Sequence, residues 1–214
     1  MPGQKKIRIY LAGPMVFYPD PLSVFDEMKT ICAKYGLEGV APIDNQMGLE
    51  GLIPGRALNL KIVQADFDLM ETLDGGIFCL DPWRRSPEMD NGTALEAGYM
   101  KALKKPMAGW TADSRPYPEK VSDYFTNVFG KPLTSTGANS TGATSGDLRD
   151  PDGMLVHSYE MVQHGMVQGA IELSGGTVYC DPDWKIAFEK AVQTLAQHFF
   201  PKTNPQLNAP APGI

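Results

Sequence analysis

The chain has 214 residues and a mass of 23.4 kDa, which corresponds to one domain or at most two small ones at the usual ~150 residues per domain. Its 19 Lys and Arg against 25 Asp and Glu give a net charge of −6 without long basic runs, so binding to a nucleic-acid polymer or an anionic membrane is disfavoured. With 43% hydrophobic and 21% charged residues, the composition is globular rather than disordered.

The first half of the chain alternates short apolar segments with amphipathic ones. Residues 7–12 are rich in β-formers and stop at a Gly-Pro pair, which predicts a first strand that runs into a loop. Ser23 can cap a helix that ends near Gly36. Residues 37–42 predict a second strand. Residues 56–73 then predict a helix with a core-facing stripe of Leu58, Ile62, Ala65 and Leu69.

The second half continues this alternation around one irregular stretch. Residues 75–80 form an apolar run that is typical of a strand buried on both faces. After a polar loop, residues 93–104 predict a helix and residues 106–110 a fourth strand. Beyond the irregular stretch, residues 177–180 predict a fifth strand and residues 184–199 an amphipathic helix. The small residues that the helix before the fourth strand would pack against the sheet are Ala94, Ala97, Gly98 and Ala102.

Two segments have the composition of flexible chain. Within residues 133–146, ten of fourteen residues are Ser, Thr or Gly, which predicts a flexible surface insertion near 133–150. Residues 201–214 are rich in Pro and predict a disordered tail. We therefore assign a single domain to residues 1–200.

The order of the elements predicts an α/β fold. Short apolar strands alternate with amphipathic helices, which favours a parallel sheet covered on both faces. We expect a single doubly wound domain, flavodoxin- or Rossmann-like, with a five-stranded, mostly parallel sheet flanked by helices. In such sheets ligands bind outside the carboxyl ends of the strands, where the loops converge.

The sequence carries no signal for a membrane, for export or for a metal. Its apolar runs are far shorter than the roughly 20 residues of a membrane span, and its N-terminus has no apolar leader core, so we expect a cytoplasmic protein. Cys32, Cys79 and Cys180 have no paired spacing and predict buried thiols. The three His residues form no ligand pattern, so we expect neither a metal nor a cofactor.

Three polar loops follow predicted strands, at residues 13–20, 44–50 and 81–91. None contains the glycine-rich motif of a dinucleotide site or the P-loop motif of a triphosphate site, which disfavours both ligands. The loops instead supply carboxylates, which are Asp44, Asp81, Glu88 and Asp90, with Glu96 in the helix that follows.

Two carboxylates allow both a catalytic and a structural interpretation. Asp90 can cap the following helix, which places Glu96 near the helix N-terminus, where the helix dipole stabilises a negative charge by ~0.3 to 1 kcal/mol. An ionised Glu96 can attack an electrophilic carbon, or it can simply support the start of its helix. Asp66 borders the apolar stripe of its own helix, and its structural alternative is a salt bridge with Arg56 or Lys61.

Five segments, in the same order along the chain, resemble one family from residue 7 to about residue 200. The longest is Asp90-Asn91-Gly92-Thr93-Ala94-Leu95-Glu96-Ala97-Gly98-Tyr99, followed by Lys105-Pro106. The others are Ile9-Tyr10-Leu11-Ala12-Gly13-Pro14 with Phe17, Pro42-Ile43-Asp44-Asn45-Gln46, Asp66 eight residues before Asp74-Gly75, and Asp81-Pro82-Trp83-Arg84. Together these segments resemble the nucleoside 2-deoxyribosyltransferase family.

The resemblance implies an enzyme of nucleotide salvage that moves the 2-deoxyribosyl group of a 2′-deoxynucleoside from one nucleobase to another. Glu96 matches the nucleophile, which attacks C1′ and forms a covalent deoxyribosyl-Glu96 intermediate in a retaining ping-pong mechanism. Asp66 matches a residue that contacts the base, and it would donate a proton to the departing base and accept one from the incoming base, which requires a raised pKa. Tyr10 would hydrogen-bond Glu96 and fix its side chain.

The same resemblance implies the contacts with the substrate. Asp90 would accept hydrogen bonds from sugar hydroxyls, and Gln46, with Asp44 and Asn45 close by, would face the base or order the second loop. Gly13 belongs to the matching first loop. The candidate apolar walls for the base ring, each of which is equally compatible with a core position, are Met15, Phe17 and Trp83.

The implied partners are 2′-deoxynucleosides, free nucleobases and further copies of the chain, in a homo-oligomer with sites near the subunit interfaces. One segment departs from the family. Relatives carry Gly-Leu-Pro-x-Asn-Leu-Met late in the chain, where this chain has residues 165–171 with Gly169 in place of the Asn. Either Gln168 takes over that contact or the sugar hydroxyls are recognised differently.

Two other functions stay open at this point. A hydrolase of 2′-deoxynucleoside 5′-monophosphates, with water as the acceptor, would need a cationic or Ser-rich phosphate loop, whereas residues 14–20 are apolar and end in a carboxylate. A non-catalytic nucleoside-binding module on the same fold would lack the carboxylate that Glu96 supplies. Whether purines alone or also pyrimidines are accepted is equally open.

Overall fold

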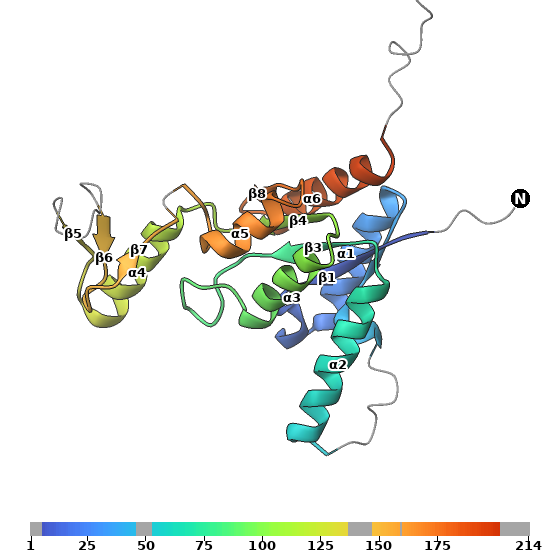
Figure 1. Cartoon of the computed structure of the whole chain (residues 1–214), viewed down its shortest axis with the longest axis horizontal. Helices are drawn as coiled ribbons and strands as arrows, with labels where there is room; N and C mark the ends of the chain where they lie inside the picture. The colour runs from blue at the N-terminus through green and yellow to red at the C-terminus, as the bar shows by residue number, and fades with distance from the viewer. Residues whose placement is uncertain (1–5, 46–52, 137–146, 159, 202–214) are drawn as a thin grey trace, which may run out of the picture.

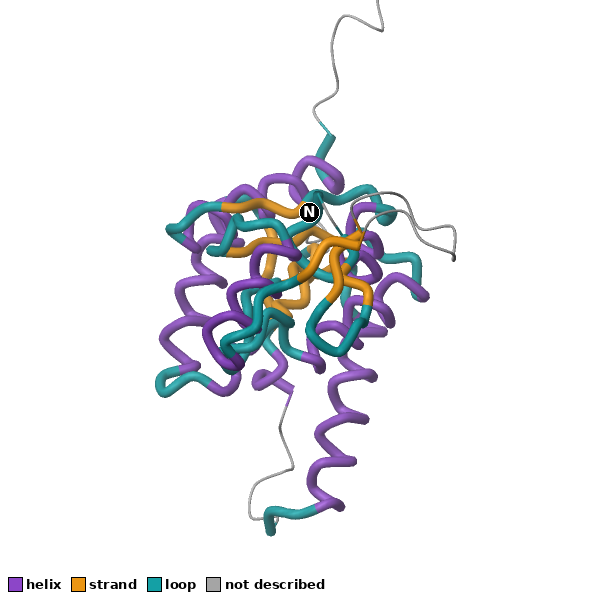
Figure 2. The backbone as a smooth tube through the Cα atoms, turned by 90° about the vertical axis from the view of Figure 1, so that its left-hand side faces the viewer, coloured by secondary structure: helices purple, strands orange, loops and turns teal. Residues whose placement is uncertain are grey.

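The computed structural model describes residues 6–45, 53–136, 147–158 and 160–201. Its centre is a five-stranded sheet in the order β2-β1-β3-β4-β8, and every neighbouring pair of strands is parallel, which confirms the predicted sheet (Figures 1 and 2). The strands are β1 (Ile7–Ala12), β2 (Leu37–Val40), β3 (Gly75–Cys79), β4 (Met107–Thr111) and β8 (Val178–Cys180).

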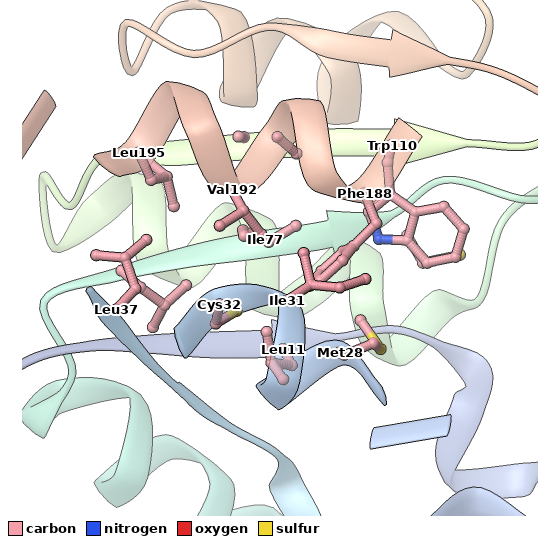
Figure 3. Packing of buried hydrophobic residues seen from close by; sticks show 14 of the residues in the cluster. Leu11, Met28, Ile31, Cys32, Leu37, Ile77, Trp110, Phe188, Val192 and Leu195 are labelled. Carbon is pink, nitrogen blue, oxygen red and sulfur yellow. The ribbon is translucent and has the colours of Figure 1, made fainter. Parts of the chain in front are cut away.

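Helices cover both faces of this sheet. Alternate strand residues point to opposite faces, so β1 sends Leu11 to one face and Tyr10 to the other. On the Leu11 face, α1 (Pro21–Lys34) and α6 (Trp184–Phe199) pack apolar side chains such as Cys32, Phe188 and Val192 against the strands (Figure 3). On the Tyr10 face lie α2 (Arg56–Thr72), α3 (Asn91–Ala102) and α5 (Gly165–Glu172). The fold is therefore doubly wound, as expected.

The strand order identifies where a ligand would bind. The chain moves from β1 to β2 at one side of the sheet and from β3 to β4 at the other, so the order reverses between the adjacent strands β1 and β3. Loops diverge at such a point and leave a crevice at the carboxyl ends of the strands. The loop after β1 forms the short helix η1 (Pro14–Phe17), and the loop after β3 runs to the start of α3.

Two details at the start of the chain differ from the sequence expectation. Helix α1 begins at Pro21, and Asp20 rather than Ser23 caps it, because the backbone N–H of Ser23 donates to the Asp20 carboxylate at 3.2 Å. Pro21 suits the first helical position because its missing N–H would have no partner there. Strand β2 ends at Val40, since residues 42–45 turn into the short helix η2 (Pro42–Asn45).

Helix α2 contradicts the predicted core stripe. Of the four stripe residues only Leu69 is buried, together with the neighbouring Met70, whereas Leu58, Ile62 and Ala65 are partly exposed. The reason is geometric: the N-terminal part of α2 extends beyond the body of the domain, and only its C-terminal end reaches the sheet (Figures 1 and 2). The apolar residues of α2 do recur with a helical period, but no other part of the described chain packs over the N-terminal half of this apolar face.

Helix α3 also packs differently from the expectation. The residues that it buries are Thr93, Ala97 and Met100, so the face toward the sheet is rotated away from the small residues Gly98 and Ala102, which are exposed. A Cβ atom added at Gly98 would meet no atom within 4 Å. The exposed small residues therefore leave a shallow surface on the outer side of α3.

The stretch between β4 and β8 is more regular than the sequence indicated. It forms α4 (Tyr117–Phe129), α5 and a three-stranded antiparallel sheet of β5 (Thr134–Thr136), β6 (Asp147–Arg149) and β7 (Leu155–Val156), which lies with α4 to one side of the main sheet (Figure 1). Residues 137–146, most of the predicted insertion, and 202–214 of the tail lie outside the described residues. No helix in the described ranges is long and apolar enough to span a membrane.

Candidate active site

Tyr10 and Glu96 meet on the face of the sheet that α2 and α3 cover. Tyr10 lies near the end of β1 and is fully buried, and its phenol O–H donates to Glu96 Oε1 at 2.8 Å. Glu96 reaches this position because it lies on α3 one residue before the buried Ala97, at the edge of the helix face that packs on the strands. The hydrogen bond expected between these two side chains is thus present.

Asp66 approaches the same pair from α2. It contributes to the raised pKa of both Tyr10 and Glu96, which places its charge close to them. Its Oδ1 atom is buried and has no hydrogen-bond partner among the described residues. No ion pair of the described residues joins Asp66 to Arg56 or Lys61, the partners that a structural role would need. An unpartnered buried carboxyl oxygen is costly.

Burial dominates the electrostatics of the two carboxyl groups. It raises the pKa of Asp66 to about 6. It likewise raises the pKa of Glu96 to about 8; the Tyr10 hydrogen bond lowers that pKa in part, and the charges of Asp66 and Asp90 raise it further. The pKa of Tyr10 is well above its usual value, chiefly because the phenol is buried and then because Glu96 and Asp66 are near. Desolvation therefore outweighs the helix dipole at Glu96.

The loop after β3 ends in a well-formed helix cap. Asp90 is the N-cap of α3, and its Oδ2 accepts hydrogen bonds from the backbone N–H and the hydroxyl of Thr93, both at 2.9 Å. This fixes the first turn of α3 and with it the position of Glu96. Among the described residues, the hydrogen bonds to the Asp90 carboxylate go to Oδ2. A capping role is therefore compatible with a second role for Oδ1 toward a ligand.

An aromatic pair connects the first and third loops. Phe17 is 61% exposed at the end of η1, and its ring lies 5.5 Å from that of Trp83, centroid to centroid. Met15, the third predicted wall, is instead buried in the core. Gly13 allows this close packing, because a Cβ there would lie 2.5 Å from the Met15 sulfur and 2.7 Å from the Cys79 Cβ.

The second loop has side chains that are engaged within the protein. Asp44 accepts the backbone N–H of Ala41 at 2.8 Å and pairs with Lys29 at 2.7 Å, so it stabilises the turn at η2. Asn45 donates to the carbonyl of Ala65 at 3.0 Å and thereby links η2 to α2. Contacts of these two residues with a substrate stay a prediction. Gln46 lies outside the described residues.

The segment that departs from the family pattern is the start of α5. Gln168 is buried, its carbonyl oxygen accepts the N–H of Val162 at 2.9 Å, and its amide donates to Glu172 at 2.8 Å. Both ends of the amide are thus occupied, which does not favour Gln168 as the replacement for the missing Asn. Gly169 has open space where a side chain would be.

Two contacts that brace the third loop were not evident from the sequence. The phenol of Tyr117 donates to the carboxylate of Glu88, and the buried Gln163 amide approaches the carbonyls of Leu80 and Pro87 at 3.4 and 3.3 Å. Both partners come from chain far beyond the loop, so spacing could not reveal them. They hold the loop between β3 and α3 against α4 and the start of α5.

The chemistry available here is that of two buried carboxyl groups and a phenol. Within the described ranges, no group of three or more His, Cys, Asp or Glu residues is placed to hold a metal ion. With pKa values of about 6 and about 8, Asp66 is largely ionised and Glu96 largely protonated near neutral pH, so the pair together retains a proton. One group can then act as a nucleophile while the other handles a proton.

Comparison with known proteins gives a consistent picture. A sequence model of the family described as nucleoside 2-deoxyribosyltransferase matches residues 9–166. An uncharacterized protein of Schizosaccharomyces pombe is 48% identical over 188 residues, which cover 88% of either chain. Among solved structures, a 2-desoxiribosyltransferase from Leishmania mexicana (TM-score 0.53, 21% identity) covers 87% of this chain and 97% of its own. A conserved protein from Enterococcus faecalis V583 (TM-score 0.54, 16% identity) covers 89% and 99%. These two likenesses support the fold.

Burial of Glu96 predicts a pH-dependent stability. Its folded-state pKa of about 8 lies above the usual 4.5, so the unfolded chain ionises first and stability is lost as the pH rises through this window. Glu96→Gln removes that loss and still accepts the Tyr10 hydrogen bond. We expect it to be more stable than the parent by at least about 1 kcal/mol near pH 8.5 and equal to it near pH 4.5.

Urea unfolding at the two pH values measures this difference. Glu119→Gln, at an exposed position on α4, is the matched control and should follow the parent at both pH values. A Glu96→Gln protein that is less stable than the parent near pH 8.5 would contradict the buried environment of this carboxyl.

Proposed function

Because the chain belongs to the nucleoside 2-deoxyribosyltransferase family, we propose that it transfers the 2-deoxyribosyl group of a 2′-deoxynucleoside to another nucleobase through a covalent deoxyribosyl-Glu96 intermediate. The observation that carries the proposal is the hydrogen bond from the buried Tyr10 to the partly buried Glu96, with the partly buried Asp66 close by. A cytoplasmic location and a role in nucleotide salvage are parts of the same proposal.

In the first half of the reaction, an Oε atom of Glu96 forms a bond to C1′ while the bond between C1′ and the base nitrogen breaks. The electron pair of the broken bond stays on the base, and the Asp66 carboxyl supplies the proton that neutralises it. The pKa of Glu96, about 8, is above that of Asp66, about 6, so the free site holds its proton on Glu96 near neutral pH, and this proton moves to Asp66 before the attack. The hydrogen bond from Tyr10 holds Glu96 and stabilises its ionised form before the attack.

In the second half, the incoming base attacks C1′ from the side that the first base vacated. The bond between C1′ and Glu96 breaks, the electron pair returns to the carboxylate, and Asp66 takes the proton of the new base nitrogen. Two inversions at C1′ give net retention, as in retaining glycosidases. A deoxyribosyl group suits this route because the missing 2′-hydroxyl makes the cation-like transition state easier to reach.

The loops around the crevice supply the remaining contacts in this proposal. The free Oδ1 of Asp90 accepts a hydrogen bond from a sugar hydroxyl, while Oδ2 continues to cap α3. The exposed ring of Phe17 and the ring of Trp83 border the base. Asp66 Oδ1, which has no partner among the described residues, faces the base edge.

Two rival functions have less support. A hydrolase of deoxynucleoside 5′-monophosphates would need cations in the loop after β1, and residues 14–20 offer none. A non-catalytic binding module has no use for a carboxyl group whose burial raises its pKa to about 8, as it does at Glu96.

We further propose that the chain forms a homo-oligomer through the face made by α2, α3 and α5. An apolar groove of about 640 Å³ runs along this face, beside the helices that carry Asp66 and Glu96. Leu95 is 61% exposed and Met166 78% exposed at the groove, and Gly98 leaves room for close approach of another backbone. A second copy is the occupant that would also cover the projecting part of α2.

The first prediction for this function is exchange of the base. Deoxyadenosine or deoxyinosine incubated with a different free base should give the exchanged deoxynucleoside, which chromatography detects without any added metal or cofactor. Mass spectrometry of the parent with donor alone should detect one added deoxyribosyl group. Glu96→Ala should abolish both signals and still bind nucleoside. Absence of exchange and hydrolysis with every purine and pyrimidine donor, or the added mass on another residue, would contradict the assignment.

The second prediction concerns the proton that Asp66 donates. Asp66→Asn should lower kcat/KM with deoxyadenosine by roughly 100-fold or more, because a purine leaves poorly without a proton. With a nitrophenyl 2-deoxyriboside, whose leaving group needs no proton, the loss should be below about tenfold. Steady-state kinetics with both donors measures this ratio, and an equal loss with the two donors would show that Asp66 is not the acid.

The third prediction concerns assembly. At about 10 μM the parent should sediment as an oligomer, and Leu95→Glu should shift it to the monomer, because a charge cannot be buried at an apolar interface without a partner. Leu22→Glu, at a comparably exposed leucine of α1 (65% exposed), is the matched control and should leave the assembly unchanged. A monomeric parent in sedimentation velocity would refute the interface.

A further inference from the structure

A separate cavity lies between the loop after β3 and helix α4. Its volume is about 370 Å³, and its polar lining consists of Arg85, Ser86, Arg115, Lys120, Asp123 and Asn127. The volume lies at the lower end of the usual range for small-molecule sites. None of these side chains has a part in the proposed transfer reaction.

Lys120 is the most unusual of these residues because it is a buried cation. Only 3% of it is exposed, and its Nζ donates to two neutral acceptors, the carbonyls of Asp113 at 3.0 Å and Val162 at 2.8 Å. An ammonium group has three donors, so one N–H is left without a partner among the described residues. Burial also lowers the pKa of Lys120, and the charges of Asp113 and Asp81 raise it in part. A charge held in this way is stabilised when an anion binds beside it.

One cation that lines the cavity, Arg85, is not neutralised by a carboxylate among the described residues. Arg115 is paired with Asp113 at 2.6 Å and with Asp123 at 2.5 Å, which neutralises it. Arg85 is exposed and forms no ion pair among the described residues.

The turn that carries Arg84 and Arg85 directs their side chains to different places. Arg84 and Arg85 both have a positive φ, 52° and 62°, which is uncommon for residues other than glycine. This backbone sends the Arg84 guanidinium over the Trp83 ring at 5.1 Å, whereas Arg85 lines the cavity. The two residues thus differ in position but not in chemistry.

We propose that this cavity binds a phosphate-type oxyanion, either free phosphate or the phosphoryl group of a small phosphorylated molecule. A guanidinium such as that of Arg85 binds two oxygens of a phosphate at once, and the third N–H of Lys120 supplies a charged donor from the buried side. The Ser86 hydroxyl and the Asn127 amide line the same space. Because Ser86 and Trp83 belong to one turn, the bound anion also steadies the loop beside the aromatic pair.

Calorimetric titration of the full chain with inorganic phosphate tests the proposal directly and does not depend on catalysis. Arg85→Ala should weaken phosphate binding at least fivefold, whereas Arg84→Ala, the neighbouring charge-matched control, should change it less than twofold. Glu96→Gln should bind phosphate like the parent, so a failure of the transferase assignment leaves this result intact. Absence of phosphate binding to the parent, or equal binding by Arg85→Ala and the parent, would overturn the proposal.

A second titration identifies the source of the anion. The probes are 2′-deoxyadenosine 5′-monophosphate and 2′-deoxyadenosine. Binding of the monophosphate at least fivefold tighter than both inorganic phosphate and 2′-deoxyadenosine, with the difference lost in Arg85→Ala, assigns the site to a phosphorylated small molecule. Equal affinities for monophosphate and inorganic phosphate, both weakened by Arg85→Ala, assign it to free phosphate. Monophosphate binding that Arg85→Ala leaves unchanged would place that phosphoryl group outside the cavity and contradict the assignment to a phosphorylated molecule.

Discussion

The arrangement of this protein depends on one hydrogen bond, from the Tyr10 phenol to the Glu96 carboxyl group. A carboxylate on the covered face of a sheet loses its hydration, and the raised pKa of Glu96 reflects this cost. A phenol from the strand beneath offsets part of the cost without adding a charge. Because the donor belongs to β1 and the acceptor to α3, the bond also ties the position of that helix to the sheet.

Asp66 and the loops extend this centre toward a substrate. Parallel strands in the order β2-β1-β3-β4-β8 open a crevice between β1 and β3, and the loops that follow these strands bring Phe17 and Trp83 into contact there. Asp90 caps α3 with its Oδ2 atom, which leaves Oδ1 available for the sugar contact proposed above. Strand β1 therefore carries Tyr10, helices α2 and α3 carry Asp66 and Glu96, and the loops carry the aromatic pair.

Much of this could be predicted from the sequence because it depends on local patterns. The five strands and the doubly wound sheet follow from short apolar runs, whereas the contact between Tyr10 and Glu96 was implied by the family resemblance. The predictions that were wrong concern which face of a helix is buried by the rest of the chain. Periodicity identified the apolar side of α2 but could not indicate that Leu58 and Ile62 extend past the sheet.

The contacts missed by the sequence analysis come from residues distant along the chain. Tyr117 supports Glu88, and Lys120 lines a cavity with Arg85, yet α4 lies in a stretch whose sequence indicated no regular structure. Asp44 belonged to a matching motif, but its ion pair with Lys29 depends on the packing of η2 against α1. Spacing along one segment contains no information about such partners.

The alternation of β1 has a consequence for how the sequence of this protein can diverge. Tyr10 and Leu11 face opposite layers, so inserting or deleting a single residue in the strand would exchange a phenol for an aliphatic side chain beneath Glu96. The strand is therefore intolerant of length changes, whereas the surface turns at its end are free of that restriction. Evolutionary drift in ligand preference can accumulate in those turns while the reacting groups stay in register.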